Sequence, residues 1–148
     1  MGSQSDPYDL ERFVIAQNPV YARVCAELRA GEKRSHWMWF VFPQLQGLGS
    51  SPMARKYAIS SLDEARAYLA HPILGPRLKE CTALVQAIEG RTLEQIFYEP
   101  DNFKFCSCMT LFAKAADDPS PFVSALEKYN QGRMDEKTLQ LLEIVDGG

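Results

Sequence analysis

The segment from Asp101 to Ala116 most constrains what this chain can fold into, because apolar residues occupy nearly every side of the helix it would form. Asp101, Lys104 and Ser107 make one polar line at three-residue spacing. A helix that is hydrophobic almost all round is covered by other elements. The segment therefore predicts a helix at the centre of the protein. Its apolar residues include Phe103, Phe105, Cys106, Met109, Leu111 and Phe112.

Helix-boundary signals recur along the rest of the chain, and no segment shows convincing strand alternation. Asn18 can cap a second helix, with Pro19 in its first turn, and Gly31 can end that helix. Thr92 with Gln95 fits a capping box, which marks another helix start. This succession of helices indicates an all-α fold.

Length and composition fit one compact domain. A chain of 148 residues, 46% hydrophobic and 24% charged, is typical of a globular protein. We expect residues 1–148 to form a single domain of seven or eight helices around the central buried helix, with residues 1–8 as a flexible tail.

Charge and cysteine content restrict the classes of partner. The formal net charge is −3 and Lys and Arg are spread along the chain, so nucleic acid is not an expected partner. The chain has neither a membrane-spanning apolar run nor an apolar signal core, which predicts a cytoplasmic protein without a membrane partner. No motif requires a metal or a cofactor, and none identifies a protein partner. The cysteines, which lack metal-ligand spacing, are Cys25, Cys81, Cys106 and Cys108.

The stretch GEKRSHWMWFVFPQLQGLGSSP, residues 31–52, places basic and polar groups directly against an aromatic run. Residues 37–42 favour a short buried helix, because Ser35 can cap it and Pro43 can stop it. A buried strand is the alternative, but no other segment offers it a sheet partner. The combination suits a partly buried binding site, and it also suits a core element with a solvated cap.

Lys33 and Arg34 are the first candidates for binding a ligand. If Ser35 caps a helix, free backbone N–H groups and the positive end of the helix dipole would face the same way as these cations. A phosphate or carboxylate would then bind there. The glycine-containing loop that ends at Ser51 could add backbone donors. The alternatives are a solvated basic turn and a plain loop.

Aromatic and titratable residues supply the other candidates. Trp37 and Trp39 could stack on a planar ligand, although tryptophans in an apolar run are more often core residues. His36 is the better placed of the two histidines for proton transfer near neutral pH. Asp101 and Lys104 either form an ordinary ion pair facing solvent or join the basic corner in one cleft.

Three segments, SHWMWFVFPQLQGLGSSPMARKYAI, EARAYLAHPILGPRL and DNFKFCSCMTLF, resemble a bacterial family of unknown function, domain of unknown function 1810. Its members are sometimes labelled calpastatin. The resemblance covers about Leu10 to Leu142 and implies a compact, mainly α-helical single domain without an assigned reaction. The calpastatin label implies little, because such an inhibitor is largely disordered and this chain is patterned for a packed core.

The order Ser-His-aromatic, followed by a Ser-Pro-x-Ala helix, is also similar to the helical superfamily that processes NAD- or ADP-ribose-linked substrates. That superfamily places a functional acidic residue beside its histidine. The tripeptide Ser35-His36-Trp37 departs from this pattern, because no carboxylate adjoins it in the sequence.

Two functions from different classes follow. In the first, the protein binds or processes a phosphorylated or nucleotide-like small molecule. Its candidate site residues then converge on one concave site. In the second, it is a non-enzymatic protein-interaction module whose aromatic segment is core. The first hypothesis assigns His36 and Asp101 to catalysis, and assigns to ligand binding Lys33, Arg34, Trp37, Trp39, Ser51, Arg55 and Lys104.

Overall fold

The computed structural model describes residues 6–144. These residues form ten helices and no strand beyond one isolated parallel bridge, which confirms the all-α prediction. The count exceeds the expected seven or eight because three of these helices have only four or five residues. The helices are α1 (Glu11–Gln17), α2 (Tyr21–Ala30), α3 (Met38–Val41), α4 (Pro52–Lys56), α5 (Leu62–Ala70), α6 (Leu74–Ala87), α7 (Leu93–Phe97), α8 (Asp101–Ala115), α9 (Ser120–Asn130) and α10 (Glu136–Leu142).

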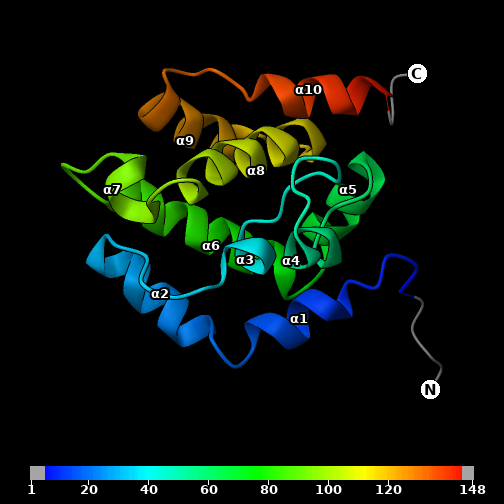
Figure 1. The fold of residues 1–148 in the computed structure, drawn as a ribbon, viewed down its shortest axis with the longest axis horizontal. Coiled ribbons are helices and arrows are strands. Elements are labelled where there is room, and N and C mark those ends of the chain that lie inside the picture. Colours follow the sequence, from blue (N-terminus) through cyan, green and yellow to red (C-terminus); the bar gives the residue numbers. More distant parts are fainter. Residues whose placement is uncertain (1–5, 145–148) are drawn as a thin grey trace.

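The helices are arranged in layers. In Figure 1, α1 and α2 lie along one side of the molecule, α9 and α10 lie along the opposite side, and α6 and α8 lie between them. Buried apolar residues from all these layers form one contiguous hydrophobic cluster. Within the described part of the chain, no helix is long and apolar enough to cross a membrane.

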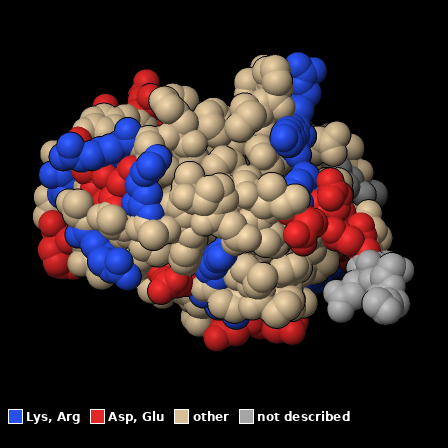
Figure 2. All heavy atoms as spheres, turned by 90° about the horizontal axis from the view of Figure 1, so that it is seen from below, with Lys and Arg blue, Asp and Glu red and all other residues tan. Residues whose placement is uncertain are grey.

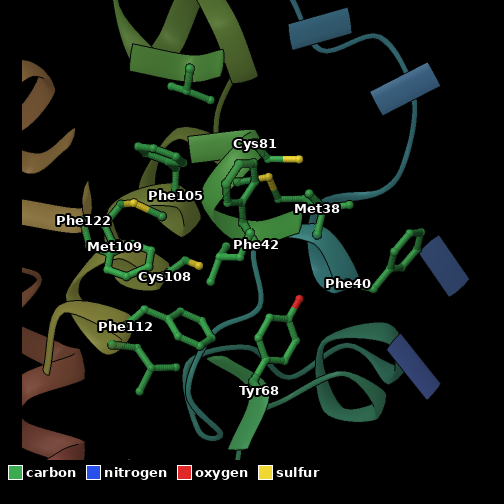
Figure 3. Close-up of a cluster of buried hydrophobic side chains, with 14 of the residues drawn as sticks. Met38, Phe40, Phe42, Tyr68, Cys81, Phe105, Cys108, Met109, Phe112 and Phe122 are labelled. Carbon is green, nitrogen blue, oxygen red and sulfur yellow. The ribbon is translucent and has the colours of Figure 1, made fainter. Parts of the chain in front are cut away.

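Helix α8 is the buried centre that its sequence predicts. It packs against α5, α7, α9 and α10, and Figure 3 shows Phe105 and Phe112 inside the cluster of buried side chains. Both have no exposed surface. Phe103 departs from the prediction, with 58% of its surface exposed. Phe103 lies in the first turn of α8. Helix α10 contacts α8 further along, where the Thr110 hydroxyl accepts a hydrogen bond from the Asp135 N–H at the start of α10.

The aromatic run folds as the predicted short helix. Helix α3 spans Met38–Val41, and its flanking residues Trp37 and Phe42 are both buried. The predicted cap is wrong, because Trp37 occupies the N-cap position and no side chain caps this helix. The Ser35 hydroxyl instead donates to the carboxylate of Glu27, at 2.6 Å.

Other helix boundaries follow local signals to different degrees. Thr92 and Gln95 form the predicted capping box, and Gly31 ends α2 in the left-handed conformation that glycine adopts readily, with φ 79°. The predicted Asn18 cap is wrong. Helix α2 begins three residues later at Tyr21, and Asn18 instead lies at the C-terminal end of α1.

The segment before α1 is held against its first turn. Of the expected tail, residues 1–5 lie outside the described residues. The carboxylate of Asp6 accepts hydrogen bonds from the backbone N–H groups of Leu10 and Glu11, at 2.8 and 3.1 Å. Residues 6–8 therefore form the turn that leads into α1.

Arg12 of α1 connects this first region to the segment between α4 and α5. Its guanidinium donates to the carbonyl oxygens of Lys56 and Ala58, each at 2.8 Å. It also donates to the Tyr8 carbonyl and forms an ion pair of 3.1 Å with the largely buried carboxylate of Glu64. These contacts fix the position of α4, which carries Arg55.

Candidate functional site

Two neighbouring concave regions lie on either side of the first turn of α8. The first, called here the narrow pocket, lies between α3, the loop of residues 44–49, α4 and Lys104 of α8. Its enclosed volume is about 20 Å³, which accommodates about one water-sized group. Among the side chains that line it are Trp39, Gln44, Gln46, Arg55, Tyr57 and Lys104.

The second region, called here the hollow, lies between the turn of residues 32–36, the end of α7 and the start of α8. Its volume is about 520 Å³. Lys33, His36, Tyr98, Glu99 and Asp101 are among its lining residues. The candidate residues from the sequence are thus divided between two neighbouring sites rather than gathered in one.

Asp101 joins the two regions. Its carboxylate oxygens lie 2.9 Å from Lys33 Nζ and 3.6 Å from Lys104 Nζ. Each ammonium also lies over a tryptophan ring, Lys33 5.3 Å from the centroid of Trp37 and Lys104 5.7 Å from that of Trp39. Both contacts fall within the range of cation–π attraction. The two polar patches of the sequence therefore meet through Asp101.

The two tryptophans differ in burial. Trp37 is 1% exposed and packs edge-on against Phe97, with ring centroids 6.5 Å apart. Its ring is enclosed by the core, so the structure gives no support to the binding role considered for Trp37. Trp39 is half-buried and lines the narrow pocket. Of the two rings, only that of Trp39 is available to a bound molecule.

A residue that sequence reasoning missed, Glu27 of α2, organises the turn before α3. Its buried carboxylate accepts hydrogen bonds from the backbone N–H groups of Arg34 and Ser35, at 2.8 and 3.2 Å. It also accepts from the Ser35 hydroxyl at 2.6 Å and from Trp37 Nε1 at 2.8 Å. A charged residue directly beside Leu28, on the apolar stripe of its helix, is the sequence signal that could have found it.

The hydrogen bonds to Glu27 outweigh the effect of its burial. Burial alone raises the pKa of a carboxyl group, because it disfavours the charged form. The backbone N–H of Arg34 and the side chains of Ser35 and Trp37 lower it, and the net pKa of Glu27 lies below its ordinary value. The turn from Arg34 to Trp37 is therefore built around an ionised carboxylate.

The anion site expected at Lys33 and Arg34 does not have the predicted geometry. The backbone N–H groups of Arg34 and Ser35 already bond Glu27. The Arg34 guanidinium pairs with Glu32 at 3.0 Å, and Lys33 pairs with Asp101. The donors and cations of this turn are thus neutralised within the protein.

The glycine-containing loop belongs to the narrow pocket. Gly47 and Gly49 line it beside Arg55 of α4. A Cβ atom at Gly49 would lie 2.6 Å from the Cβ of Ala54, so only glycine fits this close approach between loop and helix. Ser51 caps α4 by accepting from the Ala54 N–H at 3.1 Å, which makes it a structural residue next to the pocket.

His36 and Tyr98 are exposed residues of the hollow. His36 has no hydrogen-bond or ion-pair partner among the described residues, whereas His71 Nδ1 accepts from the backbone N–H groups of Ile73 and Leu74. Tyr98 is 49% exposed and its hydroxyl contacts Glu32. Its backbone, at φ 65° and ψ 159°, lies in a region that essentially only glycine occupies. No local pattern in the sequence singles out Tyr98.

The two regions carry opposite charge. The narrow pocket has the cations Arg55 and Lys104, and among the described residues that line it none is acidic. The hollow has three carboxylates, from Glu32, Glu99 and Asp101, against its two cations. Figure 2 shows basic and acidic residues close together at both ends of the viewed face, with a largely uncharged stretch between them.

The cysteines lack the surroundings of reactive thiols. Each is free, and three of them are buried. Burial raises the pKa of Cys81 to about 12 and that of Cys106 to about 11, which disfavours the nucleophilic thiolate. The described residues contain no group of three or more His, Cys, Asp or Glu arranged to hold a metal ion.

Comparison with known proteins places the chain in a family. The family model described as "Protein of unknown function (DUF1810)" matches residues 7–142. The chain belongs to this family. The crystal structure of the conserved hypothetical protein Rv1873 from Mycobacterium tuberculosis is similar over 93% of this chain and 98% of that chain, with 62% sequence identity and a TM-score of 0.91.

These comparisons confirm the family resemblance and leave the function open. No curated protein matches the chain. The calpastatin label and the similarity to proteins that process NAD- or ADP-ribose-linked substrates gain no support from them, and the second stays a hypothesis.

Proposed function

We propose that this protein binds a phosphorylated small molecule, with the phosphate held at the narrow pocket. The observation that carries the proposal is that Arg55 and Lys104 both line this pocket, with no acidic residue among the described residues that line it. Asp101, which pairs with Lys104 at 3.6 Å, lines the hollow instead. Arginine and lysine are the side chains that recognise phosphate, through a planar fork and a point charge respectively. The half-buried Trp39 adds an aromatic wall.

The size of the narrow pocket limits what enters it. A volume of about 20 Å³ admits one oxygen-sized group, so a phosphate oxygen can enter while the rest of the molecule stays outside. The size of the pocket favours a small group, and its two cations favour an anionic one. The ligand can be nucleotide-like or sugar-like, because the pocket itself would contact only the anionic end and the ring of Trp39.

The proposal concerns binding, and a reaction is an extension of it. His36 is the one imidazole at the site, since the other histidine contacts the start of α6. Asp101 lies between the two regions, beside both lysines. A reaction would use these two residues for proton transfer, as the sequence suggests.

Calorimetric titration tests the proposal with inorganic phosphate, AMP and ADP-ribose as ligands. The double variant Arg55→Ala/Lys104→Ala should lose roughly tenfold or more in affinity for each, since it removes two charge-assisted contacts. The affinity of the wild type should fall with added salt. Trp39→Phe should abolish any ligand-induced change in tryptophan fluorescence, because Trp37 is buried.

A matched control removes one arginine and one lysine elsewhere. Arg66→Ala/Lys79→Ala changes net charge equally, on α5 and α6, outside both regions. This variant should bind as the wild type does. Equal binding by all the variants would refute the site, and no binding by the wild type would favour the interaction-module alternative.

A further inference from the structure

The hollow differs from the narrow pocket in the ligand chemistry that it suits. We propose that the hollow binds the hydroxyl-bearing part of the same ligand, so that the ligand is a sugar phosphate or a nucleotide whose sugar lies against Glu99, His36 and Tyr98. This inference rests on the proposed function, because the phosphate at Arg55 and Lys104 fixes the other end of the molecule.

Volume and position make the hollow a suitable second half of the site. At about 520 Å³ it falls within the range of small-molecule sites. It adjoins the narrow pocket through Asp101 and Lys104, which are three residues apart on α8 and 3.6 Å apart as an ion pair. A molecule whose phosphate contacts Lys104 therefore lies close to Asp101, which lines the hollow.

Most charges of the hollow are already paired within the protein. Lys33 pairs with Asp101, Arg34 pairs with Glu32, and the Tyr98 hydroxyl contacts the second oxygen of Glu32. Glu99 and His36 remain, and neither side chain has a hydrogen-bond or ion-pair partner in the described part of the chain. The groups that are free for a ligand are thus one carboxylate and one imidazole.

This pair matches hydroxyl groups better than it matches charged groups. A carboxylate only accepts hydrogen bonds, while a neutral imidazole has one donor and one acceptor, and a hydroxyl can satisfy both. A second phosphate would meet the excess of carboxylates, and an ammonium group would meet Lys33 and Arg34. Sugar hydroxyls therefore fit the residues that line the hollow, as carboxylates elsewhere accept the hydroxyls of ribose.

Tyr98 supplies the apolar surface that the carbon face of a sugar ring requires. Its half-exposed ring lies at the hollow although its backbone is strained at φ 65°. Backbone strain of this kind concentrates at binding sites, where the surrounding structure holds it in place. Glycine at this position would relieve the backbone but would remove the ring.

Calorimetry with a small panel of ligands tests the inference. The panel is inorganic phosphate, ribose 5-phosphate, phenyl phosphate and ribose. Ribose 5-phosphate should bind more tightly than phenyl phosphate, which has a ring without hydroxyls. Glu99→Ala should lower the affinity for ribose 5-phosphate roughly tenfold or more, because it removes a charged hydrogen-bond partner. The same variant should leave the affinity for inorganic phosphate unchanged. Glu94→Ala is the matched control, because Glu94 is an exposed acidic residue of α7 that lines neither region.

The outcomes separate this inference from the proposed function. If Glu99→Ala and His36→Ala both leave ribose 5-phosphate binding unchanged, or if phenyl phosphate binds as tightly, the hollow does not recognise hydroxyls. The proposed function survives that result whenever Arg55→Ala/Lys104→Ala still weakens phosphate binding. If no phosphorylated ligand binds to the wild type, both proposals are overturned. Circular dichroism of each variant shows whether its fold is intact.

Discussion

Two lysine–tryptophan pairs flank Asp101, and they differ in what surrounds them. Lys33 lies over Trp37, whose ring is enclosed by core aromatics and whose indole N–H is bound by Glu27. Lys104 lies over Trp39, whose ring borders the narrow pocket. The tryptophans are two residues apart and the contacts are chemically alike. The difference teaches that burial, rather than residue type, separates the structural pair from the pair that can meet a ligand.

Trp37→Ala should have the largest effect on stability. Removing a fully buried aromatic side chain leaves a cavity and should lower the free energy of unfolding by about 3–5 kcal/mol. Trp39→Ala should cost much less, because that ring is only half-buried. Urea denaturation of both variants measures the contrast, and equal losses would contradict the assignment of one tryptophan to the core and the other to the site.

Asp101→Asn should have the next largest effect, because it removes the partner of both lysines. The side chain of Lys33 is only 9% exposed, so an unpaired ammonium there should cost about 2–3 kcal/mol, less than the loss of a fully buried pair. Asp63→Asn, at an exposed ion pair with Arg66, should cost under about 1 kcal/mol. Chemical denaturation measures the free energy of unfolding of the two variants. Similar losses of this free energy would show that Lys33 is well solvated.

Glu27→Gln should have a smaller, pH-dependent effect of about 1–2 kcal/mol near neutral pH, since an amide oxygen still accepts some of the hydrogen bonds. The pKa of Glu27 is lower in the folded protein than in the unfolded chain. Its carboxylate therefore stabilises the fold fully above the unfolded value of about 4.3, and this contribution is lost as the pH falls through the lower folded value.

The measurement that checks this is the free energy of unfolding of wild type and Glu27→Gln between pH 7 and pH 3. The difference between the two proteins should shrink as the pH falls below the unfolded value. A difference that stays constant over that range would show that the carboxylate is not ionised in the fold. Asp117→Asn, at an exposed loop position, provides a control for general acid effects.

Local pattern was sufficient to predict much of the fold. The apolar circumference of residues 101–116 and the capping box at Thr92 each depend on neighbours in the sequence, and both are confirmed. Ser35 shows where this reasoning fails. Its hydroxyl is an ordinary capping group, but a carboxylate from the preceding helix binds it, and that competition depends on tertiary contact.

The sequence was sufficient to propose individual residues of the candidate site, but not to predict how they are arranged in space. Arg55, Lys104 and Trp39 are all expected ligand residues from the sequence, and the structure brings them together at the narrow pocket. Lys33 lies instead at the hollow, where it pairs with Asp101, 68 residues later in the chain. No periodicity or spacing encodes a contact of that kind.

The contacts of Arg12 make α1 part of the framework that supports the narrow pocket. By holding the carbonyl oxygens of Lys56 and Ala58, this one guanidinium fixes the backbone on both sides of Tyr57, next to Arg55. A shortened version of the protein that begins after α1 would leave those carbonyls without their donor. A fragment of this protein that keeps the pocket therefore has to retain α1 with its Arg12 side chain.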